Sequence, residues 1–265
     1  MSIARNLANL IGNINAGGGG VNRNLVINGA MNVAQRGTSV TGIGTSKNNA
    51  YHTVDRFRLA FNNTDGQVTM TQDSSAPEGF ANSIKLACTT ADTSIAADEY
   101  FFMDTKLEGQ NLQTIAKGTS SAKPLALSFY VKGNASATYV VELYDGDNNR
   151  NLSNSFSVTT DWQRVEIAIP ADTTGTFDDD NAESLNMAFW LHAGSNFTSG
   201  TLDTTWGSNT NANRAVGISS FLDSTSRTFF ITGVQLEVGQ NPTEFEHEPF
   251  EAVSYTHLRA HETCH

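Results

Sequence analysis

An alternation of apolar and polar residues marks several extended segments in the middle of the chain. In one segment Leu127, Phe129 and Val131 alternate with Ser and Lys residues, and the segment 165–169 alternates in the same way. A period of two is that of a strand with one face in a core and the other toward water. The pattern therefore predicts half-buried antiparallel strands.

Further strands follow from the same reasoning. The segment 139–143 alternates and leads into Asp145-Gly146, a dipeptide favoured in tight hairpin turns. Apolar runs near 186–192 and 227–238 complete the set. The chain is thus predicted to be all-β, an antiparallel jelly-roll β-sandwich with a short N-terminal α-helix.

Two long segments between these strands, 173–183 and 195–215, are polar and contain few apolar residues. They are predicted to be loops, and loops of this length usually carry function.

The predicted helix comes first in the chain, over residues 2–15. Ile3, Leu7, Leu10 and Ile14 recur at spacings of four and three, which is a heptad seam. Two heptads are too short to be stable alone. The helix therefore either lies on the domain or joins several chains.

These patterns divide the chain into four parts. Residues 1–16 form the helix, 17–22 a Gly-rich hinge, 23–252 the jelly-roll sandwich and 253–265 a separate tail. One large domain is favoured over two small ones, because all-β sandwiches of this size are routinely single units.

Two matched segments lie near the ends of the sandwich. The segments 22–37 and 231–247 each carry an apolar run of strand type flanked by Asn and Gly, with about 190 residues between them. They predict that the first and last strands of the sandwich meet.

Composition narrows the partners. The formal net charge is -11, and an acidic surface repels phosphate backbones, so nucleic acid is an unsuitable partner. No stretch reaches 18 consecutive apolar residues, so membrane insertion is not expected. The chain begins without the basic start and apolar core of a signal peptide, and release by cell lysis is the expected route outward.

Several motifs follow one another along the chain. They are the opening ING…QRG within 27–37, then Tyr51, Asp55, Arg56 and Phe57, then LSFYVKG at 127–133, the Trp-led strand 162–169, and the closing TGVQLEVG…T-x-FE at 232–246. In this order the motifs resemble the distal domain of tail fibre proteins from tailed bacteriophages, and the resemblance covers roughly residues 22–250.

The resemblance implies a virion protein without enzymatic activity that attaches to a bacterial surface receptor, a glycan or a protein. It implies contacts with other tail or virion proteins, a homotrimer, and synthesis in the cytoplasm of the bacterial host before lysis. Two alternatives stay open. One is a carbohydrate-binding module of a secreted glycan-degrading system, and the other is a structural decoration protein without a ligand.

Trp206 is the leading candidate for contact with a ligand. It lies in a loop rich in Thr, Gly, Ser and Asn, together with Asn209, Asn211 and Asn213. Sugar rings stack on aromatic faces, and amides bind hydroxyl groups. The other two tryptophans, Trp162 and Trp190, lie at or in predicted strands and are expected in the core.

An acidic run, Asp178, Asp179 and Asp180, is a weak candidate for calcium, the one cofactor that the sequence suggests. With Glu183 the run could also supply the paired carboxylates of a glycoside hydrolase. A solvated loop is the simpler interpretation.

Other chemical motifs are weak. Asp145, Asp147 and Asn149 begin like a calcium loop, but its sixth and twelfth positions are unsuitable, which favours a hairpin tip. Neither His52 nor His192 has a nucleophile motif beside it, so no enzyme is predicted.

The last 13 residues differ in character from the rest. They hold three of the six histidines, and they resemble translated sequencing-adaptor read-through. Their His-Glu-x-x-His match at 261–265 is interpreted as accidental, because the chain stops on its second histidine. Of the two cysteines, Cys264 lies in this tail, whereas Cys88 lies in an apolar run and is predicted to be a buried, unreactive thiol.

Overall fold

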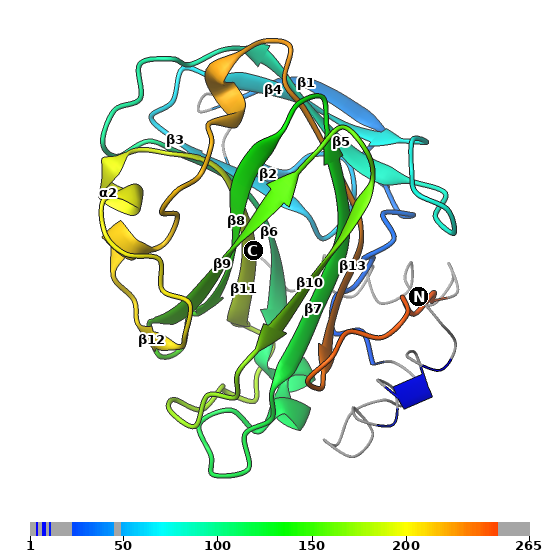
Figure 1. Ribbon diagram of the computed structural model, residues 1–265, viewed down its shortest axis with the longest axis vertical. Coiled ribbons are helices and arrows are strands. Elements are labelled where there is room, and N and C mark those ends of the chain that lie inside the picture. Colours follow the sequence, from blue (N-terminus) through cyan, green and yellow to red (C-terminus); the bar gives the residue numbers. More distant parts are fainter. Residues whose placement is uncertain (1–3, 5–6, 9–10, 12–22, 45–48, 249–265) are drawn as a thin grey trace.

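The chain folds as a sandwich of two antiparallel sheets, which confirms the predicted all-β class (Figure 1). The computed structural model describes residues 4, 7, 8, 11, 23–44 and 49–248. Helical segments in this part of the chain are short, and none is long and apolar enough to cross a bilayer.

The first sheet has six strands, and the last long strand, β13, lies near its middle. In spatial order the strands are β1 (Ser39–Ile43), β4 (Gln67–Asp73), β5 (Ser83–Thr90), β13 (Thr228–Val238), β7 (Leu125–Gly133) and β10 (Gln163–Ile169).

The second sheet has seven strands and is centred on β11. In spatial order they are β12 (Gly207–Ser208), β9 (Arg150–Val158), β8 (Ala137–Asp145), β11 (Glu183–Ala193), β6 (Tyr100–Glu108), β3 (Arg58–Asn62) and β2 (Ala50–Tyr51). The short helical elements are η2 (Gly109–Asn111), η3 (Gln113–Ile115), α2 (Ser195–Thr198), η4 (Asn211–Asn213) and η5 (Phe221–Asp223).

The main core lies between the two sheets. Phe129 of the first sheet meets Phe156 and Phe189 of the second edge to face, with ring centroids 5.1 Å apart in both pairs. Cys88 is buried in the same core, as predicted. Burying this apolar surface is the main favourable contribution to folding.

The predicted strands are confirmed, but they are not all half-buried: Ser128, expected to face water, is 2% exposed, and β8 is buried on both faces over 139–143. Leu127, Phe129 and Val131 are buried as their alternation indicated. In β10 the residues Val165 and Ile167 are only partly buried, because β10 is the last strand of its sheet. The turn 146–149 is a hairpin tip that joins β8 to β9, as expected.

The two matched end segments meet, but the first of them is not a strand. Leu25 N–H donates to Leu236 O at 2.8 Å, and Val234 N–H donates to Gly29 O at 3.0 Å. The backbone turns between these two hydrogen bonds, because Asn28 has a φ of 62°, in the left-handed region. The first strand of the sandwich is therefore β1, one step later in the chain than predicted.

A second apolar cluster covers the outer face of the seven-stranded sheet. Trp190 is fully buried there and not in the main core, beneath the segment that follows β11. Its ring contacts Tyr100, Phe102 and Phe197 at centroid distances of 6.0, 5.0 and 5.3 Å. The long segment 195–218 thus packs onto the sheet through Phe197, Leu202 and Ile218 and covers Trp190.

Four residues of the N-terminal segment are described. Ala4, Leu7, Ala8 and Ile11 are helical, and the side chains of Leu7 and Ile11 are exposed. The other seam positions, Ile3, Leu10 and Ile14, lie outside the described residues, as do 17–22 and 249–265. The heptad seam, the hinge and the tail remain predictions.

Candidate functional site

The two long polar segments meet at Trp206. This residue precedes β12, a two-residue strand that pairs with the edge strand β9. Its indole N–H donates to Pro170 O at 3.0 Å, just after the end of β10. The ring is partly buried against the main core and partly exposed. One hydrogen bond and packing against the core therefore hold the indole of Trp206 in place.

A shallow hollow of about 10 Å³ lies beside this ring. Phe177, from the segment 173–183, contributes a second aromatic wall, and Pro170 belongs to the same lining. Lys123 and Asp172 add polar groups. The sequence placed Trp206 in a functional loop but gave no sign that Phe177 would share its site.

Lys117 also lines this hollow, but protein atoms already occupy the hydrogen-bonding capacity of its ammonium group. Its ammonium pairs with the buried carboxylates of Asp145 and Asp172, and it donates to the carbonyl oxygens of Thr174 and Gly175 at 3.0 and 2.8 Å. It also lies 5.0 Å from the ring centroid of Phe177. A buried cation with this many partners holds the loop in place.

The three asparagines of the predicted site have different roles. Asn213 accepts a hydrogen bond from Thr201 N–H and donates to Asp203, both at 3.0 Å, so its side chain braces its own loop. Asn209 donates to Asn149 at the tip of the β8–β9 hairpin. Asn211 is exposed in η4. None of the three lines the hollow, so Trp206 stands apart from them.

The acidic run is exposed and its side chains serve the local loop. Asp180 accepts a hydrogen bond from Ala182 N–H at 2.8 Å, and the N–H of Asp178 donates to Asp147 at 3.0 Å. Asp179 is exposed between them. In the described part of the chain, the potential metal ligands that come together in a group of three are different residues.

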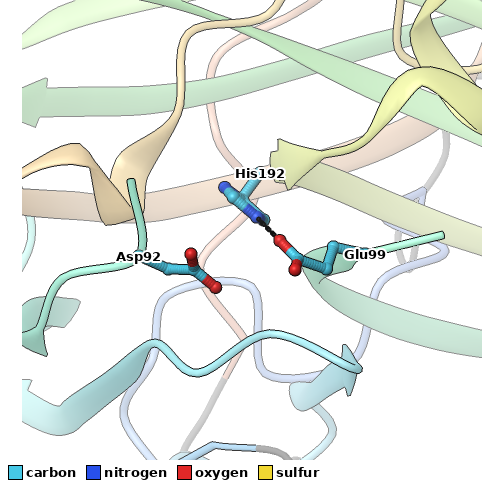
Figure 2. A group of neighbouring side chains, drawn as sticks. All are labelled: Asp92, Glu99 and His192. Atoms are coloured by element: carbon cyan, nitrogen blue, oxygen red, sulfur yellow. Dashed lines mark hydrogen bonds and ion pairs between the residues drawn. The ribbon is translucent and has the colours of Figure 1, made fainter. Parts of the chain in front are cut away.

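That group consists of Asp92, Glu99 and His192, and all three are buried (Figure 2). Asp92 and Glu99 flank the connection from β5 to β6, and His192 is near the end of β11. One ligand atom from each residue lies within 4.8 Å of the others. The sequence did not indicate this group, because a gap of 93 positions separates His192 from Glu99 and no short motif joins them.

The same histidine links Ser220 to Glu99. His192 Nδ1 is 2.8 Å from Ser220 Oγ, and Nε2 is 3.3 Å from Glu99 Oε2. Burial lowers the pKa of His192 although both carboxylates favour its charged form, so the ring is neutral at neutral pH. A serine, a histidine and an acid in a row suggest hydrolysis, but His192 is fully buried and Ser220 caps η5 by accepting from Leu222 N–H. A substrate cannot reach this ring.

Comparison with known proteins gave similarities only to solved structures. No family model and no curated protein matches the chain. A family 11 carbohydrate-binding module from Clostridium thermocellum, in complex with a β-1,3-1,4-mixed-linked tetrasaccharide, is 15% identical, with a TM-score of 0.38, over 72% of this chain and 91% of that one. The enzymatically active domain of tailspike protein 4 from bacteriophage CBA120 is 14% identical, with a TM-score of 0.42, over 82% of this chain and 21% of that one.

Proposed function

We propose that this chain is the attachment domain of a bacteriophage tail fibre and that it binds a bacterial surface glycan in the hollow beside Trp206. The observation that carries the proposal is the pairing of Trp206 and Phe177, from two separate loops, in one hollow. Sugar-binding sites need an apolar face for the ring and a few polar groups for the hydroxyls.

The geometry favours a small ligand group. The space enclosed beside Trp206 is about 10 Å³, room for about one water molecule, so a sugar ring would stack on the exposed part of the indole and place at most one substituent in the hollow. The hydrogen bond from Trp206 to Pro170 orients the ring before the ligand arrives, so little conformational entropy is lost on binding.

Weak single sites are sufficient for attachment if several copies act together. The predicted heptad seam of residues 2–15 would join the copies, and the resemblance to tail fibre proteins suggests that there are three of them. Linked copies bind a surface more tightly than one copy by factors of about 10²–10⁴. Other tail or virion proteins would hold the same trimer, which is made in the bacterial host and released by lysis.

The binding test uses the full chain against a panel of bacterial surface glycans and against whole cells. Trp206→Ala is expected to weaken binding at least about tenfold, while Trp206→Phe keeps an aromatic face and retains most of it. Trp162→Ala is the matched control, because Trp162 is also a partly exposed tryptophan but lies on Lys132 and Phe230 of the other sheet. Unchanged binding by folded Trp206→Ala protein would refute the site.

The panel also separates the two alternatives. Binding to soluble polysaccharides but to no bacterial cell would favour a module from a secreted glycan-degrading system. Binding to nothing would favour a decoration protein. Light scattering of the full chain and of a Leu7→Glu variant checks the assembly: three times the chain mass of 28.5 kDa is expected, falling to one chain in the variant.

A further inference from the structure

The buried group of Asp92, Glu99 and His192 carries more negative charge than its surroundings balance. No described lysine or arginine pairs with either carboxylate, and His192 is the only cationic candidate in the ion pairs of the described chain that reach Glu99. Two carboxylates in a buried position are costly without a counterion.

The carboxylate of Glu99 points into the group. Its side chain is 6% exposed, and Oε2 lies 3.3 Å from His192 Nε2. An ionised carboxylate can accept about four hydrogen bonds, so the contact with His192 leaves room for a cation on the same carboxylate.

The orientation of the imidazole fits a metal ligand. His192 Nδ1 is 2.8 Å from Ser220 Oγ, while the other ring nitrogen, Nε2, faces Glu99 (Figure 2). When Nδ1–H donates to this hydroxyl, Nε2 presents a lone pair to the carboxylates. Such a bond on the far nitrogen is how proteins fix the tautomer of a metal-binding histidine.

Asp92 is held in place before any ion binds. Its carboxylate accepts hydrogen bonds from Thr64 Oγ1 at 2.6 Å, Asp65 N–H at 2.9 Å and Ser94 N–H at 3.2 Å.

We propose that Asp92, Glu99 and His192 bind one divalent transition-metal ion, of the type of Zn²⁺. One nitrogen and two carboxylate ligands suit zinc, and calcium prefers oxygen ligands throughout. With bonds of about 2.0–2.2 Å, neighbouring ligands of a tetrahedral zinc lie about 3.3–3.5 Å apart. The separation of 3.3 Å between His192 Nε2 and Glu99 Oε2 meets this value, and the ligand atom of Asp92 lies within 4.8 Å of both.

Such an ion would act as a staple, that is, a cross-link between separate parts of the fold. It would tie the β5–β6 connection, which holds Asp92 and Glu99, to the end of β11 at His192. Through Thr64 and Ser220 the same group reaches the β3–β4 turn and η5. The staple is independent of glycan binding, since none of its ligands lines the hollow at Trp206.

The test must first remove competing ligands in the tail, where His257, His261, Cys264 and His265 can bind zinc by themselves. The protein is therefore the full chain with these histidines changed to Ala and Cys264→Ser, stripped with EDTA. Titration with ZnCl₂ in a calorimeter is expected to show one site per chain. At a free zinc concentration about 100 times the dissociation constant, Tm should rise by about 5–10 °C.

Two variants test the ligands. His192→Gln and Glu99→Gln are each expected to weaken zinc binding at least about tenfold and to abolish the rise in Tm. Glu99→Gln removes a charge from the buried group, so it should fold at least as stably without metal as the parent does. Asp180→Asn is the matched control, since it alters an exposed carboxylate outside the group. Replacing Zn²⁺ by Co²⁺ gives a visible absorption spectrum that reports the ligands directly.

The proposal is overturned by either of two results. One is no saturable zinc binding by the protein with the altered tail. The other is binding that His192→Gln and Glu99→Gln leave unchanged, which would mean an adventitious ion only. Stronger binding of Ca²⁺ than of Zn²⁺ would also overturn the assignment to a transition metal.

Discussion

The carboxylate of Glu246 accepts a hydrogen bond from the backbone N–H of Arg23 at 2.6 Å, across 223 positions of sequence. The side chain of Arg23 in turn donates to Thr243 Oγ1 at 3.0 Å and to Glu244 O at 2.8 Å. Both ends of the sandwich are thereby joined through polar groups. The closing motif T-x-FE, which the sequence pointed to, supplies the partners of the opening motif.

Asn24 is expected to be the most sensitive polar residue of this closure. Its amide donates to Val234 O at 3.1 Å and accepts from the N–H groups of Val26 and Leu236 at 3.0 and 3.1 Å. Asn24→Ala leaves these buried backbone groups without partners and should lower the free energy of unfolding by about 2–3 kcal/mol. Urea unfolding measures the loss, with the exposed Asn211→Ala as control. A change under about 0.5 kcal/mol would contradict the closure.

Gly29 marks a close approach of two backbones in the same region. A Cβ at this position would lie 2.0 Å from Val234 O, a clash that no rotation of a side chain relieves. Gly29→Ala should therefore separate the opening segment from β13 and lower Tm by several degrees. Gly146→Ala is the matched control, because its nearest neighbour atom is 3.6 Å away. Equal Tm values for the two variants would show that the approach is looser than described.

The strands could be predicted from the sequence, because each shows a local alternation of apolar and polar residues such as that around Leu127, Phe129 and Val131. The burial of Trp190 outside the main core could not be predicted. Its alternation places it opposite the main core, and only the later segment around Phe197 covers it. Likewise, Trp206 could be recognised as unusual from its polar neighbours, but its partner Phe177 comes from a distant loop. Contacts between segments far apart leave no periodic signal in one sequence.

Cys88 is expected to be inert toward thiol reagents. Burial raises its pKa to about 11, and the nearby carboxylate of Asp223 acts in the same direction. The thiolate, which is the reactive form, is therefore scarce even at pH 9. In a Cys264→Ser background Cys88 is the only cysteine, and iodoacetamide should label it more than about tenfold faster in 6 M urea than in buffer. Rapid labelling of the folded protein at pH 8 would contradict its burial.

Acid is expected to weaken the wall of the hollow through Asp172. This carboxylate accepts hydrogen bonds from Arg150 Nε at 2.9 Å and from Thr174 N–H at 3.0 Å, and it pairs with Lys117 at 3.2 Å. Burial raises its pKa, but these partners outweigh burial, and the pKa in the folded protein lies below the ordinary value. The unfolded chain therefore takes up a proton first as the pH falls.

The sign of the effect follows from this order. The stability that Asp172 contributes is fully present above the unfolded pKa of about 3.9 and is lost as the pH falls from there through the lower folded value. Asp172→Asn should lower the free energy of unfolding at pH 7 by about 3 kcal/mol, since it leaves Arg150 and Lys117 short of a partner. Its Tm should then change less between pH 5 and pH 2.5 than that of the parent. Scanning calorimetry at both pH values tests this, and Asp179→Asn, at an exposed position, is the control. Equal changes in Tm with pH for the parent and Asp172→Asn would exclude Asp172 as a source of the acid sensitivity.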